Sequence, residues 1–285
     1  MNHGRTMLAG RGVSLRADCV ADSAGGLTFD VTAGGASGTA HLVLRRRDGQ
    51  GEVGLPLAPT ADGRLRAALP STVALPEGRW DAYARVADDE PLRLAPGATD
   101  LRALTARTPS GSRGQVAVRI PYSPTLGFAR AGGPPSRQGN LTVRSWLRAP
   151  HAEAGEVRAE GAGLTVRGRL YGTCFAPGAY AEVRPRHSPG PALRSDVGAD
   201  EARFGFSVTY AALGPGVWDL WLRPHGESGP RVRIARLLDD VADKKPVFTY
   251  PRARVQTEYG PLEAGPYYTR DNDLSVSVTA CPSPQ

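Results

Sequence analysis

The sequence predicts an all-β protein of two tandem antiparallel β-sandwich domains, immunoglobulin-like in kind and related by internal duplication. Three observations lead to this prediction: many short apolar runs separated by turn residues, few helical patterns, and a Trp-Asp strand that occurs twice. A chain of 285 residues with 40% apolar residues is long enough for two domains with buried cores. We place the first domain at residues 1–150 and the second at residues 151–285.

Strand patterns run through both halves of the chain, with Gly, Pro, Asp or Ser between them. In the first half the expected strands are residues 26–31, 39–46, 52–58, 64–69, 79–86, 91–95, 115–123 and 140–147. In the second half they are residues 164–172, 179–186, 191–197, 202–210, 217–224, 231–238, 247–259 and 273–280. Many short strands at regular spacing are typical of sandwiches and barrels. The strongest helical pattern is residues 233–245, which also fits a strand followed by a turn.

The two halves match at three points in the same order. GLTFDV matches GLTVRG, RWDAY matches VWDLW, and GNLTVRSW matches NDLSVSVT. The matched pairs are Gly26 and Gly163, Trp80 and Trp218, and Leu141 and Leu274. The members of each pair are separated by nearly the same number of residues, as expected after duplication with small changes in loop length. The segment 148–163, charged and rich in small residues, is the expected linker.

The repeated strand indicates what its tryptophan and aspartate do. Because side chains alternate between the two faces of a strand, the Trp and the following Asp lie on opposite faces. We expect Trp80 and Trp218 to be buried between sheets, with a ligand role as the alternative. We expect Asp81 and Asp219 to accept a turn or cross-strand hydrogen bond, with a catalytic acid as the alternative.

The formal charge of +7 comes almost entirely from Arg, since Lys occurs only at Lys244 and Lys245. The arginines are either dispersed over the surface or gathered in a patch that binds phosphate or an acidic polymer. The densest runs, RRR at residues 45–47 and RVRIAR at residues 231–236, are not interleaved with aromatic residues, so a nucleic-acid partner is not expected.

The three cysteines are widely separated, so neither a disulfide framework nor a zinc site is predicted. The five histidines have no ligand spacing, and we expect no metal and no cofactor. No apolar run is long enough for a signal peptide or an integral membrane segment, and we expect a cytoplasmic protein.

The P-x-G-x-W-D-L strand and the ending PYYTRDNDLSVSV, residues 266–278, resemble the C-terminal tandem β-sandwich accessory region of actinobacterial teichoic-acid-type glycosyltransferases and glycerophosphotransferases. That family often ends in a strand of the form PYxTxxGNLSxxV. Here Asp271, Asn272 and Asp273 stand where the family usually has a Gly-Asn turn, and we expect no catalytic domain before the repeats. The resemblance implies polymer binding, oligomerisation or support of a glycosyltransferase.

No local motif of catalysis is present: neither a Gly-x-Ser-x-Gly elbow, a phosphate-binding Gly-rich loop nor a His-Glu-x-x-His pair occurs. Asp271 and Asp273 have the spacing with which sugar-nucleotide transferases hold a divalent metal. Such aspartates follow a strand of an α/β domain, and no alternating strand and helix pattern occurs here, so a solvated hairpin turn is the expected structure.

Aromatic rings on a strand's outer face can stack on a sugar. The candidate ligand-binding residues are Trp221, Tyr83, Tyr267 and Tyr268. Trp221 is the best of them, because alternation places it opposite the core-facing Trp218. The alternative is that Trp221 covers an interface between the two sandwiches or between subunits of a homo-oligomer.

Three hypotheses of function follow. The first is a non-catalytic protein that accompanies a cell-envelope or secondary-metabolite glycosyltransferase and binds an anionic glycan polymer or the glycosyltransferase itself. The second is a transferase or cyclase with its active site in the cleft between the two domains, a site that need leave no local motif. Its candidate acids are Asp81, Asp219, Asp271 and Asp273. The third is a structural protein that forms oligomers.

Overall fold

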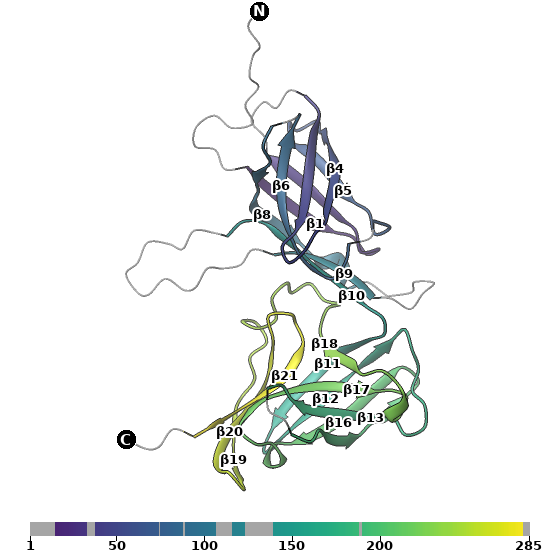
Figure 1. The fold of residues 1–285 in the computed structure, drawn as a ribbon, viewed down its shortest axis with the longest axis vertical. Helices are drawn as coiled ribbons and strands as arrows, with labels where there is room; N and C mark the ends of the chain where they lie inside the picture. Colours follow the sequence, from purple (N-terminus) through teal and green to yellow (C-terminus); the bar gives the residue numbers. More distant parts are fainter. Residues whose placement is uncertain are drawn as a thin grey trace, which may run out of the picture. The chain divides into compact units, whose positions relative to one another are not determined.

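The computed structural model of the protein describes residues 15–32, 38–73, 75–87, 89–106, 116–122, 139–187 and 190–281. These residues form β-strands, turns and short 3-10 helices, so the prediction of an all-β protein is confirmed (Figure 1). Within these ranges no helix is long and apolar enough to cross a membrane. The chain divides into two compact units, which we call the first unit (Met1–Arg107 and Ala117–Leu147) and the second unit (Thr108–Val116 and Arg148–Gln285).

The first unit is built on one sheet that is nearly barrel-shaped. Its strands are β1 (Arg16–Ala21), β2 (Leu27–Thr32), β3 (Ala40–Arg46), β4 (Glu52–Pro59), β5 (Leu65–Leu69), β6 (Gly78–Val86), β7 (Leu92–Arg93), β8 (Ala95–Asp100), β9 (Val116–Tyr122) and β10 (Thr142–Arg148), with a 3-10 turn η1 (Arg102–Leu104). The strand order is β8-β1-β2-β5-β4-β3-β6-β10-β9, with β7 paired to β6. Strand β8 pairs with β1 in parallel, whereas β2 pairs with β1 antiparallel.

The second unit contains the other sheet. Its strands are β11 (His151–Glu160), β12 (Gly163–Tyr171), β13 (Tyr180–Pro185), β14 (Leu193–Asp196), β15 (Gly198–Asp200), β16 (Arg203–Thr209), β17 (Gly216–Arg223), β18 (Val232–Ala235), β19 (Ala253–Thr257), β20 (Gly260–Tyr268) and β21 (Leu274–Ala280), with 3-10 turns η2 (Tyr210–Ala212) and η3 (Gly226–Ser228). The order is β15-β16-β12-β11-β18-β17-β21-β20-β19, and β13 joins β17 to β14.

The strand that carries the Trp-Asp pair has matching neighbours in the two units. Strand β6 pairs with β3 on one side and β10 on the other, while β7 pairs with its end. Strand β17 pairs in the same way with β13, β21 and β18. In each unit the parallel pairing also recurs, since β1 pairs with β8 and β11 pairs with β18. The sequence matches of the two halves therefore fall on strands with the same partners.

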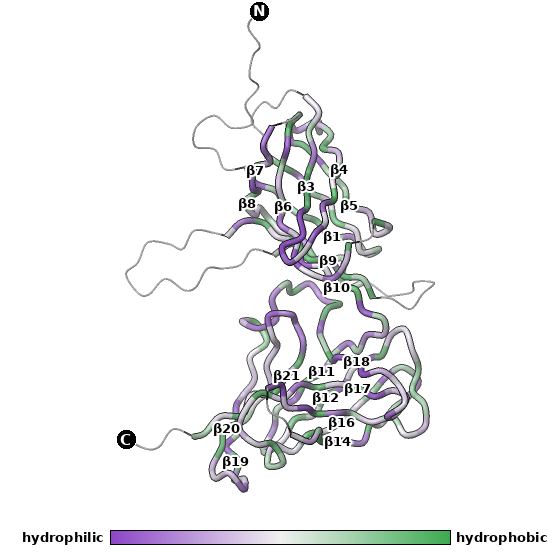
Figure 2. Tube along the Cα trace, viewed as in Figure 1, coloured by the Kyte–Doolittle hydropathy of each residue, from purple (hydrophilic) through white to green (hydrophobic). Residues whose placement is uncertain are grey.

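Alternation along these strands places the indoles in the two cores, as predicted. Trp80 is 2% exposed and Trp218 is 9% exposed. The indole nitrogen of each donates to a carbonyl oxygen four residues earlier, at Pro76 (3.1 Å) and Gly214 (2.9 Å) respectively. Each ring therefore buries its apolar surface and still satisfies its one polar group. Figure 2 shows hydrophobic and hydrophilic residues mixed along the strands of both units.

The linker predicted at residues 148–163 is wrong, because most of this segment is strand β11. Its buried positions carry His151, Ala152 and Ala154, which gave it too little apolar character to be recognised as a strand. Residues 233–245 begin with β18 and continue in turns, which is the second of the two structures expected there. Strands β1, β15 and β20 were not predicted, and only the first residue of β8 lay in a predicted strand.

We expect Trp218→Ala to lower the free energy of unfolding by about 3–5 kcal/mol, because it leaves a cavity in the core of the second unit. Urea denaturation followed by circular dichroism measures this change. The control is Val247→Ala, whose side chain is 58% exposed and should change stability by no more than about 0.5 kcal/mol. Equal losses in the two variants would contradict the anchoring role of the indole.

Candidate ligand-binding surface

Asp81 joins three strands on the outer face of the first unit. Arg47 Nη2 donates to Asp81 Oδ1 (2.5 Å) and to Thr142 Oγ1 (3.1 Å). Thr142 Oγ1 donates in turn to Asp81 Oδ1 (3.1 Å), and Arg93 Nη1 lies 3.2 Å from the same oxygen. The carboxylate therefore links β6 to Arg47, which follows β3, and to β7 and β10.

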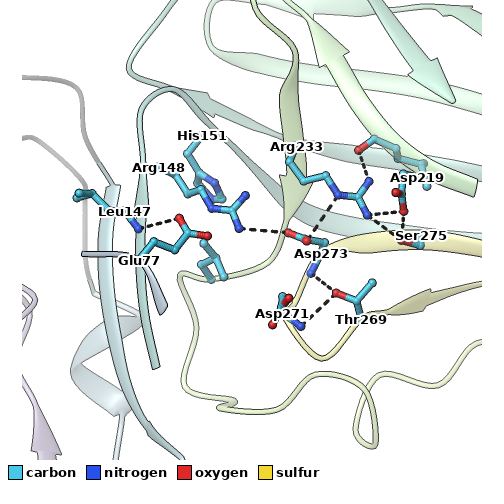
Figure 3. A network of polar contacts seen from close by, with 12 residues as sticks. Glu77, Leu147, Arg148, His151, Asp219, Arg233, Thr269, Asp271, Asp273 and Ser275 are labelled. Atoms are coloured by element: carbon cyan, nitrogen blue, oxygen red, sulfur yellow. Dashed lines mark hydrogen bonds and ion pairs between the residues drawn. The ribbon is translucent and has the colours of Figure 1, made fainter. Parts of the chain in front are cut away.

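Asp219 makes the same contacts in the second unit. Arg186 Nη2 donates to Asp219 Oδ1 (2.6 Å) and to Ser275 Oγ (3.0 Å). Ser275 Oγ donates to Asp219 Oδ1 (3.0 Å), and Arg233 Nη2 also donates to that oxygen (2.8 Å), as Figure 3 shows. The expected cross-strand acceptor role of the two aspartates is confirmed by these hydrogen bonds.

The surroundings of both aspartates favour their ionised form. Burial alone would raise the pKa of Asp219, but Arg186, Arg233 and the Ser275 hydroxyl outweigh it and hold the pKa below its usual range. Burial would also raise the pKa of Asp81, but Arg47, Arg93 and the Thr142 hydroxyl outweigh it and hold that pKa below its usual range. A carboxylate held ionised by two arginines is poorly suited to donate a proton to a substrate.

The acids at the other candidate site lie in a turn. Thr269 Oγ1 accepts from the backbone nitrogens of Asp271 and Asp273 (3.2 Å each), and Asn272 adopts a φ of 60°. Asp273 lies 3.6 Å from Arg148 and 3.6 Å from Arg233 (Figure 3). Among the described residues no group of three or more His, Cys, Asp and Glu side chains could hold a metal. The hairpin turn expected from the sequence is confirmed, but the expectation that it is solvated is wrong, because Asn272 is buried and both aspartates are half-buried.

The outward aromatic rings of the repeated strands each lie beneath two arginines. The guanidinium carbons of Arg45 and Arg93 are 5.1 and 4.9 Å from the centre of the Tyr83 ring. Those of Arg231 and Arg233 are 5.2 and 5.1 Å from the Trp221 ring. These are cation–π distances, and both rings are half-buried.

The two tyrosines of the C-terminal motif have different surroundings. Tyr268 is fully buried and packs against Phe248 and Tyr250, with ring centres 5.8 and 6.4 Å apart. It offers no face to a ligand, and we leave it out of the candidate surface. Tyr267 is half-buried beside Arg186, opposite Ser275 in the register of β20 and β21.

The two outer faces differ in the carboxylate that holds their arginines. Opposite Trp221, β13 carries Glu182, which is 3% exposed and lies 2.6 Å from Arg223, 2.8 Å from Arg184 and 3.8 Å from Arg231. This network fills the face beside Trp221.

Opposite Tyr83, the first unit has the apolar Val43 in place of that glutamate. The arginines at the matching register positions, Arg45 and Arg85, reach Glu52 on the neighbouring strand β4 instead (2.7 and 3.8 Å). The carboxylate thus lies to one side of the face and leaves room beyond it.

That room is an open groove of about 650 Å³, which we call the first groove. Its lining residues are Thr39, His41, Arg45, Arg85, Ala87, Asp89, Glu90 and Pro91. Arg45 both lines the groove and lies over Tyr83. Most of this lining could not be predicted from the sequence, because it comes from the start of β3, the end of β6 and the turn that follows, which only the tertiary fold brings together.

No family model matches the chain, and no curated protein matches it in sequence. The structure has distant similarity to S. aureus TarS, with 10% identity and a TM-score of 0.31 over 68% of this chain and 34% of that one. Residues 217–571 of S. aureus TarS give 11% identity and a TM-score of 0.30 over 68% and 55%. The BSP domain of a biofilm associated protein gives 14% identity and a TM-score of 0.18 over 75% and 27%. The chain therefore spans about a third to a half of the two TarS structures.

We expect Asp219→Asn to lower the free energy of unfolding at neutral pH by about 3 kcal/mol, because Arg233 is 8% exposed and loses a charged partner. Since the folded pKa of Asp219 is lowered, its contribution is complete above the unfolded pKa of about 3.9 and is lost as the pH falls through the folded value. Denaturation at pH values from neutral to acidic should therefore show the variant and the wild type converging at low pH.

Asp200→Asn is the control for this measurement, because Asp200 is exposed on β15 and has no hydrogen bond to an arginine among the described contacts. Its stability should follow the wild type at every pH. Parallel curves for Asp219→Asn and the wild type would show that the carboxylate does not stabilise the fold through its charge.

Proposed function

We propose that the protein is a non-catalytic accessory protein of a cell-envelope or secondary-metabolite glycosyltransferase, and that it binds a glycan polymer. In this proposal the two units are copies of one immunoglobulin-like β-sandwich that arose by internal duplication. Their matching strand partners, indole hydrogen bonds and aspartate contacts support a common origin.

The observation that carries the proposal is the first groove. Its guanidinium groups, imidazole and hydroxyl can donate to sugar hydroxyls, and its carboxylates can accept from them. Arg45 and Arg85 also offer the paired N–H groups that bind phosphate oxygens, so a glycan with phosphodiester links fits the same groove. Since polar groups dominate the lining and the groove is open, a long polar chain suits it better than a compact apolar ligand.

Tyr83 is the aromatic residue that we assign to this site. The exposed part of its ring adjoins Arg45, and a tyrosine can offer both a stacking face and a hydroxyl to a sugar. Trp221 holds the matching position in the second unit, where the Glu182 network fills the face. We assign Trp221 to packing, within the chain or against a partner.

Binding to a microarray of bacterial envelope glycans, with both neutral polysaccharides and polyol phosphate polymers, tests the proposal. We expect the full chain to bind at least one polymer, and Arg85→Ala combined with His41→Ala to weaken that binding about tenfold or more. Binding to phosphate polymers alone would assign an anionic glycan, and binding to neutral ones would assign a neutral glycan. Absence of binding to every polymer would overturn the proposal.

Tyr83→Ala and Trp221→Ala form a matched pair for the same assay. Both remove an outward ring from the same position of the repeated strand. We expect Tyr83→Ala to weaken glycan binding severalfold and Trp221→Ala to leave it unchanged, with circular dichroism confirming that both fold. The opposite result would move the glycan site to the second unit.

A further inference from the structure

A second polar hollow lies on the outer face of β11, β12 and β16 in the second unit. Its volume is about 300 Å³, and we call it the second groove. Its lining residues are Arg158, Glu160, Gly163, Leu164, Thr165, Arg167, Ser207, Val208 and Thr209. It belongs to strands other than β13, β17 and β18, and neither the repeated Trp-Asp strand nor the Trp221 face contributes to it.

The strand register explains how this hollow is formed. Arg158, Thr165 and Ser207 lie side by side across β11, β12 and β16 and form one row. In the next row Glu160 and Thr209 lie on either side of Gly163. The glycine leaves an open place between a carboxylate and a hydroxyl. A Cβ built there would lie 3.0 Å from the Val208 carbonyl oxygen, so a side chain at this position would crowd the neighbouring strand.

The groups around this open place are suited to hydrogen bonding. The hydroxyls of Thr165 and Ser207 are 3.1 Å apart and share one hydrogen bond, which leaves the other O–H and the remaining lone pairs for a ligand. Thr209 and Glu160 face them from the next row. Donors and acceptors are therefore interleaved over a patch of two rows, as the neighbouring hydroxyls of a sugar ring require.

The charges of the second groove favour a neutral ligand. Glu156 holds both arginines, with its Oε1 at 2.6 Å from Arg158 and its Oε2 at 3.5 Å from Arg167. Glu160 adds a second negative charge, so two arginines face two glutamates. An anion would gain little net attraction here, whereas sugar hydroxyls can use both kinds of charged group.

We propose that the second groove binds a single neutral sugar residue through its hydroxyls. Its size is at the lower end of ligand sites, which fits one ring rather than a chain. No aromatic residue is among its lining, so affinity comes from hydrogen bonds alone, and we expect a dissociation constant in the millimolar range. Where the glycan polymer of the proposed function carries such a residue, the second groove is a further place at which the chain binds that polymer.

An NMR titration of the full chain tests this site separately from the first groove. Glucose, galactose, mannose and N-acetylglucosamine are added in turn while the backbone amide signals are followed. We expect at least one sugar to shift the amides of residues 158–167 and 205–209. Thr165→Val combined with Ser207→Ala should weaken that response about tenfold, because it removes both hydroxyls and keeps the volume of the strand residues nearly unchanged.

Thr28→Val is the matched control, since Thr28 lies half-buried on β2 and is among the lining residues of neither groove. It should leave every shift unchanged. If none of the four sugars shifts residues 158–167, or if the double variant responds like the wild type, the second groove is not a sugar site. In that case the proposed function still stands if the full chain binds a glycan and Arg85→Ala combined with His41→Ala weakens that binding. The two proposals therefore fail separately.

Discussion

The period of two along a β-strand is the constraint on which each unit depends. It directs the indole of the Trp-Asp pair into the core and the carboxylate that follows to the opposite face. The carboxylate then binds the arginines and the hydroxyl of the strands on either side. Two adjacent residues therefore set the packing on one face and the charge pairing on the other. If the strand shifted by one residue, the indole and the carboxylate would exchange faces.

Burial of the hydroxyl partners shows why these contacts are more than surface ion pairs. Thr142 and Ser275 are fully buried, and each bridges a carboxylate and a guanidinium. A hydroxyl that donates to one charge and accepts from another leaves no polar atom unsatisfied. The register between the central strand and its neighbour is consequently fixed from both faces.

Much of the fold could be predicted from the sequence, because strong apolar alternation and turn residues mark most of the strands. Strand β11 escaped prediction because its buried positions carry a histidine and two alanines and no large apolar residue, and β20 because its Gly and Pro residues are typical of loops. The inward Trp80 and Trp218 followed from local periodicity alone. The grooves did not, since His41 and Arg85 are brought together by strand pairing, and Gly163 matters only through its neighbours on two other strands.

The position of one carboxylate separates the two faces that otherwise share their design. With Glu182 inside the face, the arginines around it are saturated by a partner from their own sheet. In the first unit Glu52 lies on the adjacent strand β4 and pairs with Arg45 and Arg85 from one side, so the other side of these arginines stays accessible. Pairing the arginines with a carboxylate on the neighbouring strand, instead of one inside the face, thus keeps the charge pairing in both units and leaves the first groove open beside Arg45 and Arg85.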